Sequence, residues 1–396
     1  MFSIFPIRGN VSTPNGFYCD GVNVGMRKGS ADGDVAFIRS SSLCDICSVF
    51  TRNTFQAAPI VHYKQYPQDF QSDFLLVNAK NANAMTGAKG VEDIDAIFDN
   101  LSQKIEVTNP IMSSTGVIGY RLDVDRVSSA FEAFDFEAKN DNKLARSIMT
   151  TDSFEKELAF DVVLDDGSSF KIGAVCKGAG MINPAMATML CFITTDANIP
   201  KNDMDELLLE ATEQSFNRIS VDGDTSTNDT VMLMANKSSG VYHKDAFAEA
   251  LNMITFNLAM MILKDGEGAN KLVSFEVKGA KSFEDAQKAS RALSNSLLVK
   301  TALFGEDPNW GRIASTIGAS EIACDEELLS IYYDDLLIYS NEQRELDKER
   351  EDQAYKIMKQ ESFKVVCDLG LGEYSYKSYG CDLSYDYVKI NAEYRT

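Results

Sequence analysis

Histidine is nearly absent from this sequence, since the 396 residues include only His62 and His243. Enzymes built on a Ser-His-Asp or Cys-His arrangement use a histidine as the general base that activates the nucleophile. Neither histidine lies in a motif typical of that role, because "IVHYK" predicts a strand and "VYHKDAF" predicts the start of a helix. The sequence therefore disfavours a histidine-activated nucleophile.

Cysteines with the spacing of a metal site are also scarce. The eight cysteines are scattered through a long chain, which is typical of reduced thiols in a cytoplasm. Cys44 and Cys47 in "CDIC" have ligand-like spacing, but a zinc site would need a second pair or histidines, and both histidines lie elsewhere in the sequence. We therefore interpret these two cysteines as structural and expect no metal site.

Basic residues are outnumbered by acidic ones, 38 against 59, which gives a formal net charge of −21. Binding to nucleic acid or to an anionic membrane surface rests on lysine and arginine, so neither partner is expected. The N-terminal "MFSIFPIRGN" does not resemble a signal peptide, and no uninterrupted apolar run is long enough for a membrane span. We expect a cytoplasmic globular protein.

Apolar residues recur with both helical and strand spacing, which predicts a mixed α/β fold with helices covering large sheets. "AFDVVLDDGSSFKIGAVCKG" predicts a hairpin that turns at Asp166 and Gly167. Residues 244–264 are apolar nearly all round, so that helix should be buried between layers. Further helices are expected over 91–105, over 202–219 with Asn202 or Asp203 as the cap, from Ser282 to Gly305, and near 342–360.

A possible nucleophile lies in "GAGMINPAMATMLCFITTDA", where a glycine-rich loop meets an apolar strand at Thr188. Cleavage between Ala187 and Thr188 would give Thr188 a free α-amine with a pKa of about 8. Such an amine can take the proton from the hydroxyl of its own threonine, so no histidine is required. The alternative is that Thr188 simply begins a β-strand, where β-branched residues are favoured.

Two further features could support acyl chemistry. Thr115 and Gly116 in "SSTGVIGYRL" are placed in a loop ahead of a strand, and could offer a hydroxyl and a backbone N–H to an oxyanion, although most such pairs are only turns. Glu267 follows the end of a predicted helix near Lys264, where an acid is disfavoured unless a cation compensates it. A substrate ammonium could be that cation, or Glu267 could simply be exposed to solvent.

Six segments together resemble one known enzyme family. In the family's order along the chain they are "STGVIG", "KGAGMINPAMATMLCFITTDA", "SFNRISVDGDTSTNDT", "DGEGANKL", "LVKTALFGEDPNWGRI" and "VKINAEYRT". The early "RGNVSTPNGF" also fits, so the resemblance is effectively full length. On these motifs the chain resembles the ornithine acetyltransferase (glutamate N-acetyltransferase) family of arginine biosynthesis. The loop before Thr188 departs from the family pattern at Ala179, Asn183 and Ala185.

The resemblance implies a layered αββα sandwich that processes itself in the manner of N-terminal-nucleophile enzymes. It implies a catalytic domain over 1–280 and a smaller α/β domain over 281–396, whose tail returns to the site. Cleavage between Ala187 and Thr188 would give chains 1–187 and 188–396, assembled as a heterotetramer of two of each. No bound cofactor is implied, although some family members use acetyl-CoA as a co-substrate.

The resemblance also assigns roles to residues. Thr188 would accept the acetyl group of N2-acetylornithine and pass it to glutamate, and Thr115 and Gly116 would form the oxyanion hole. The implied substrate-binding residues are Thr151, Lys177, Thr188, Glu267, Asn391 and Thr396. The alternatives are an amidohydrolase or aminopeptidase on the same scaffold, which would use water as the acceptor, and a non-catalytic binding protein that keeps the fold.

Overall fold

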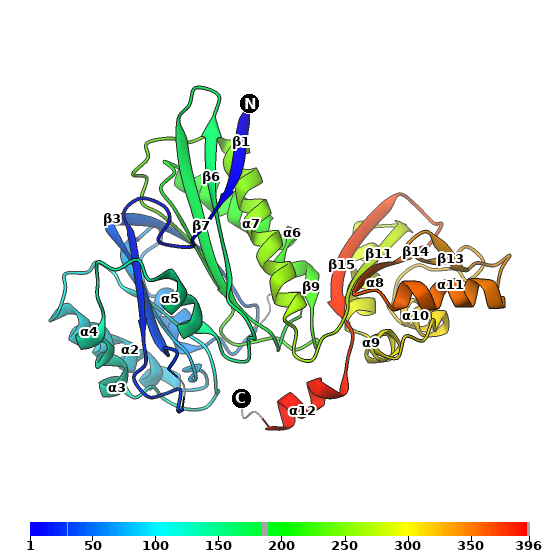
Figure 1. Cartoon of the computed structure of the whole chain (residues 1–396), viewed down its shortest axis with the longest axis horizontal. Coiled ribbons are helices and arrows are strands. Elements are labelled where there is room, and N and C mark those ends of the chain that lie inside the picture. Colours follow the sequence, from blue (N-terminus) through cyan, green and yellow to red (C-terminus); the bar gives the residue numbers. More distant parts are fainter. Residues whose placement is uncertain (30, 184–188, 394–396) are drawn as a thin grey trace.

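The structure is a computed structural model that describes residues 1–29, 31–183 and 189–393. It is mixed α/β, as the sequence predicts, and its strands form one nine-stranded and one six-stranded sheet. Figure 1 shows the larger sheet with its helices on one side, the smaller sheet with its helices on the other, and helix α12 passing beneath them.

The nine-stranded sheet has the order β1-β6-β7-β8-β10-β3-β4-β5, and β2 also pairs with β3. β6 and β7 form the predicted hairpin, in which Gly167 has the positive φ of 82° that its turn requires. The strands are β1 (Phe2–Ile7), β2 (Phe17–Val22), β3 (Val35–Phe50), β4 (Gln71–Asn78), β5 (Ile111–Ser114), β6 (Lys156–Leu164), β7 (Ser169–Lys177), β8 (Leu190–Thr195) and β10 (Thr230–Ala235).

Strand β3 divides this sheet into two layers. It is 16 residues long, and its pairing with β4 shifts register between Arg39 and Cys44. The part before the shift pairs with β2 and β4, whereas the part after it pairs with β10 and keeps only Cys44 and Asp45 paired with β4. The two halves of the sheet can therefore pack face to face while remaining one hydrogen-bonded sheet.

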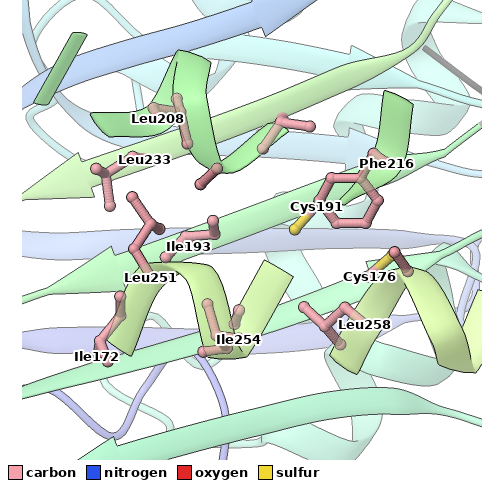
Figure 2. Packing of buried hydrophobic residues seen from close by; sticks show 14 of the residues in the cluster. Ile172, Cys176, Cys191, Ile193, Leu208, Phe216, Leu233, Leu251, Ile254 and Leu258 are labelled. Atoms are coloured by element: carbon pink, nitrogen blue, oxygen red, sulfur yellow. The ribbon is translucent and has the colours of Figure 1, made fainter. Parts of the chain in front are cut away.

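Alternation along β8 shows both faces of its layer. Cys191 and Ile193 pack with helices α6 and α7, as Figure 2 shows, whereas Leu190 and Phe192 pack against the other half of the sheet. Phe37 on β3 points outward from that second half, toward helix α2. The layers thus follow the order α-β-β-α, which is the predicted sandwich.

The outer layers are helical. Helices α6 (Lys201–Gln214) and α7 (Lys244–Lys264) cover one face, while α2 (Gly87–Ser102), α3 (Val124–Ser128) and α4 (Ala130–Ala133) cover the other. Helix α5 (Asp141–Ile148) closes the core between the two layers of strands, and α1 (Ala58–Tyr63) packs on α2. Helix α7 is long and apolar enough to cross a membrane by length and composition, but most of its apolar residues belong to this core.

The six-stranded sheet has the order β13-β12-β14-β11-β15-β9 and its own apolar core. Strand β11 precedes residue 281 and yet lies in this sheet, while the expected division of the chain at residue 280 stays a prediction. The elements are β9 (Ile219–Ser220), β11 (Leu272–Ala280), β12 (Ser330–Tyr333), β13 (Leu336–Tyr339), β14 (Ser362–Asp368) and β15 (Tyr374–Cys381), with α8 (Phe283–Asn295), α9 (Leu297–Phe304), α10 (Trp310–Gly318) and α11 (Lys348–Met358).

Several local expectations were wrong. His62 lies on helix α1 rather than on a strand, where its Nε2 is 3.2 Å from Asp95. Helix α6 begins after Pro200, and the helical stretch that Ser282 caps is broken at Ser296 into α8 and α9. The interpretation of Cys44 and Cys47 as structural is confirmed, because they belong to different buried clusters on opposite faces of β3 and do not face one another.

Candidate active site

Most of the predicted site residues line one cavity of about 170 Å³. They come from widely separated parts of the chain, at the end of β5, the end of β7, the turn after α7, and helix α12 (Tyr385–Glu393). The structure brings together Thr115, Gly116, Thr151, Lys177, Glu267 and Asn391, and adds Thr150, Gly180, Met181, Asp222, Asp224 and Tyr387.

The remaining predicted residues, Ala187, Thr188 and Thr396, lie outside the described residues. Leu190 pairs with Lys177 across the antiparallel strands β7 and β8. Thr188 is two residues before Leu190, and Lys177 lines the cavity.

A larger hollow of about 880 Å³ lies between α1 and α2 and is lined by none of the predicted residues. Among the described residues, no group of three or more His, Cys, Asp or Glu side chains is arranged to hold a metal ion. The smaller cavity is therefore the candidate for the chemistry that the sequence predicts.

Lys177 ends strand β7 and is buried within the cavity wall. Its Nζ donates to Thr150 Oγ1 at 2.7 Å and to Thr115 Oγ1 at 3.5 Å, and lies 3.9 Å from Asp152 Oδ2. Burial lowers the pKa of Lys177, the charge of Asp152 raises it, and the neighbouring Lys156 lowers it again. The ammonium is thus held by hydroxyls beside an opposite charge, and can bind a substrate carboxylate.

A buried network of charges supports Lys177 from behind. Lys156 Nζ lies 2.8 Å from Asp152 Oδ1 and 2.5 Å from Asp265 Oδ2, and none of the three side chains is more than 4% exposed. Asp152 also accepts the backbone N–H of Gly178 at 2.6 Å. Burial favours a raised pKa for Asp152, but Lys177 and Lys156 together lower it, so the carboxylate is charged.

Glu267 lines the same cavity and lies in the turn after α7, two residues beyond Asp265 of this network. Helix α7 ends at Lys264, as predicted, and the N–H of Glu267 donates to Ala179 O at 2.8 Å. A Cβ at Gly180 would lie 2.5 Å from the Glu267 carboxyl, so only glycine allows this approach. Asn391 Nδ2 of α12 donates to Glu267 Oε2 at 2.7 Å, which shows that the C-terminal helix folds back to the site.

Asp222 fixes the loop that leads toward residue 188. It accepts the backbone N–H groups of Met181 at 2.6 Å and Ile182 at 2.9 Å, and Met181 has a left-handed φ of 57°. Tyr387 of α12 donates its hydroxyl to Asp222 at 3.3 Å, so the loop and the tail share one anchor. Burial raises the pKa of Asp222, while the backbone N–H groups that it accepts lower it.

Thr115 and Gly116 follow strand β5 instead of preceding a strand, which corrects the expectation from the sequence. Gly116 has a φ of 132°, and a Cβ there would lie 2.2 Å from the carbonyl carbon of Lys80. Both observations require glycine. Asn228 supports the segment by donating to Ser114 O at 2.8 Å.

Sequence reasoning missed Thr150, Asp152, Asp222 and Tyr387. Asp152 follows directly on the "TT" of "IMTTDSF", where a buried acid near two hydroxyls could have been suspected. Asp222 belongs to "DGDTSTND", whose composition resembles a calcium loop without its ligand spacing. Nothing in the sequence near Tyr387 indicates its contact with a residue 165 positions away.

The layered sandwich and its polar cavity define an α/β protein in which, among the described residues, a buried lysine and several carboxylates line the site. The ArgJ family model matches residues 18–396, and the chain belongs to this family. The "Arginine biosynthesis bifunctional protein ArgJ" of Wolinella succinogenes is 54% identical over 397 residues, covering 100% of both chains. The protein of the same name from Oceanobacillus iheyensis is 39% identical over 400 residues, covering 98% of this chain and 97% of the relative.

Solved structures are also similar. The crystal structure of the arginine biosynthesis bifunctional protein ArgJ from Bacillus halodurans has 38% identity and a TM-score of 0.48. It covers 51% of this chain and 98% of that chain. Family membership confirms the resemblance that the sequence motifs indicate.

Proposed function

We propose that this protein is an acyltransferase of arginine biosynthesis that moves the acetyl group of N2-acetyl-L-ornithine to L-glutamate. Membership of the ArgJ family and the names of its relatives support the pathway. The observation that carries the substrate assignment is that Lys177 and Glu267 line the same cavity. A cation there suits the carboxylate of acetylornithine, and a carboxylate suits the side-chain ammonium of ornithine.

In the proposed reaction, the α-amine of Thr188 takes the proton of its own hydroxyl, and the oxygen attacks the acetyl carbonyl carbon. The C–N bond of the acetamide breaks, the proton passes to the departing nitrogen, and ornithine leaves with an acetyl-Thr188 ester behind it. Glutamate then attacks that ester through its α-amine and restores the free hydroxyl. Thr115 and Gly116 would stabilise the oxyanion of each tetrahedral intermediate, and ping-pong kinetics follow from the ester.

This mechanism requires cleavage between Ala187 and Thr188. We propose that chains 1–187 and 188–396 remain together as a cytoplasmic heterotetramer of two of each, without nucleic acid or membrane as a partner. Thr151 and Thr396 complete the proposed substrate contacts. The reaction needs no bound cofactor. The relatives are named bifunctional, and acetyl-CoA as a second acetyl donor is the corresponding proposal for this chain.

A denaturing gel with N-terminal sequencing tests the cleavage. Wild type should give two fragments, the second beginning at Thr188, while Thr188→Ala should run as one 43.7 kDa chain. A wild-type protein that stays intact after purification and incubation would refute the mechanism and favour a non-catalytic protein.

An acetyl-transfer assay distinguishes the proposed acceptor from water. The proposed transferase makes N-acetylglutamate when given acetylornithine and glutamate, and releases little acetate. A hydrolase on the same scaffold would release acetate at the same rate with or without glutamate.

A further inference from the structure

The proposed reaction places opposite demands on one cavity. Ornithine carries a side-chain ammonium, which Glu267 can face, whereas glutamate carries a side-chain carboxylate in the corresponding region. Among the described residues that line the 170 Å³ cavity, the acidic side chains are Asp222, Asp224 and Glu267, and the cation is Lys177. Lys177 is required for the α-carboxylate, so the second carboxylate of glutamate needs another cation close by.

A second hollow, of about 280 Å³, provides such a cation. It is lined by Lys80, Asn81, Val117 and Tyr120, and it borders the oxyanion segment, because Gly116 lines one hollow and Val117 the other. Asn81 forms backbone bridges with both Thr115 and Val117, which ties its wall to that segment.

The backbone of Lys80 is fixed against the same segment. Lys80 has a left-handed φ of 72°, which is uncommon for a residue with a side chain and is often retained at functional sites. Its carbonyl accepts the N–H of Val117 at 3.3 Å, and its carbonyl carbon is the atom that a Cβ at Gly116 would meet. The position of Lys80 is therefore set by the residues that would hold the oxyanion.

Lys80 also belongs to a cluster of cations within a strongly acidic protein. Its side chain is half-buried, and burial, Arg27 and Lys177 each lower its pKa, with Asp152 opposing them. Arg27 donates to the carbonyl of Met149, next to the threonines of the cavity wall. Mutually repelling cations of this kind are stabilised when an anion binds between them.

We propose that the hollow at Lys80 is the subsite for the side-chain carboxylate of the acceptor glutamate, and that Lys80 is the residue that selects an acidic acceptor. In this arrangement Lys177 holds the α-carboxylate of either substrate, Glu267 receives the ammonium of ornithine, and Lys80 receives the carboxylate of glutamate. The inference rests on the proposed function, because it assigns the acceptor of that reaction.

Acetyl transfer by Lys80→Gln tests the subsite, with Lys80→Arg restoring the charge and the exposed Lys89→Gln as the matched control on helix α2. The KM for glutamate should rise about tenfold or more in Lys80→Gln, since a charge-assisted hydrogen bond is lost. The KM for acetylornithine should change less than about twofold, because the donor does not use this subsite. Lys80→Arg should recover most of the glutamate affinity, and Lys89→Gln should behave as wild type.

Three results would overturn the proposal. They are an unchanged KM for glutamate, an equal rise in both KM values, and a selective rise in the KM for acetyl-CoA, which would assign the hollow to a phosphate. The wild type gives a test that needs no variant, because glutamine as acceptor should have a KM well above that of glutamate, and equal values would also refute the subsite. Wild type without any acetyl transfer would instead refute the proposed function.

Discussion

Replacing Asp152 by asparagine should weaken both the fold and the binding of the substrate carboxylate. Asp152 is buried, lies 2.8 Å from Lys156 Nζ, and accepts the N–H of Gly178 beside Lys177. Asparagine keeps the shape but removes the charge. Among the described residues, Lys156 then keeps the carboxylate of Asp265 and the carbonyl of Phe154, and Lys177 loses the carboxylate 3.9 Å from its Nζ.

The stability change can be sized from these contacts. Removing one partner of a buried ion pair destabilises a protein by about 3–5 kcal/mol. For a chain of 396 residues this corresponds to a fall in Tm of roughly 4–6 °C at a fixed heating rate. The pKa of Asp152 is lowered in the fold, so its contribution is present above the unfolded pKa of about 4 and is lost as pH falls. The Tm difference between the two proteins should therefore narrow in acid.

The effect of Asp152→Asn on activity should appear at alkaline pH, whereas its effect on Tm narrows in acid. Burial lowers the pKa of Lys177 and Asp152 counteracts it, so the variant should lose the Lys177 proton at a lower pH than wild type does. A plot of kcat/KM for acetylornithine against pH should fall earlier on its alkaline side in Asp152→Asn. Asp20→Asn is the matched control, since Asp20 is a buried carboxylate 3.5 Å from Lys143 and does not line the cavity. An alkaline limb that is identical in Asp152→Asn and wild type would show that Asp152 does not set the charge of Lys177.

Three further outcomes are expected. Gly180→Ala should raise the KM for acetylornithine at least about tenfold, because the added Cβ would lie 2.5 Å from the Glu267 carboxyl group and would force it to move. An unchanged KM would place the ornithine ammonium elsewhere. Asn391→Ala should raise the same KM about three- to tenfold through loss of one charged hydrogen bond, with kcat changed less, as steady-state kinetics can show. A thiol reagent should modify Cys324 first in the native protein, because the other seven cysteines are buried, and mass spectrometry of fast labelling at any other cysteine would contradict the structure.

The mixed α/β class and its individual elements could be predicted because their signals are local, whereas the layered sandwich and most of the site residues were predicted from the resemblance to a known family. Alternation around Asp166 and Gly167 indicates the hairpin, and the apolar run after Thr188 indicates a strand, which the structure has from Leu190. The prediction failed where tertiary contacts override propensity. Ile60 and Val61 favour a strand, but Pro59 lies in the first turn of helix α1, which begins at Ala58, and the packing of this helix against α2 decides the outcome.

The buried charges behind the site could not be predicted, because their partners lie far apart in sequence. Lys156 and Asp265 are separated by 109 positions, and no periodic pattern relates them. The change of layer in β3 has only a weak sign in the sequence, which is the run of three serines at 40–42 between apolar residues. Both features depend on which elements meet in space, and that information is absent from any short window of sequence.

The order of strands in the larger sheet has a consequence for unfolding and refolding after the proposed cleavage. Strands β8 and β10 follow residue 188 in sequence, yet they are inserted between β7 and β3, which precede it. After the proposed cleavage, the two chains would be joined by backbone hydrogen bonds along two strand pairs, β7 with β8 and β10 with β3. Neither chain could dissociate without breaking the hydrogen bonds of both pairs. Once unfolded, however, they would be separate molecules whose reassembly depends on concentration, whereas the uncut precursor folds as a single chain. The stability of the cleaved protein would therefore depend on how slowly it unfolds, because the native state would not readily form again from the separated chains.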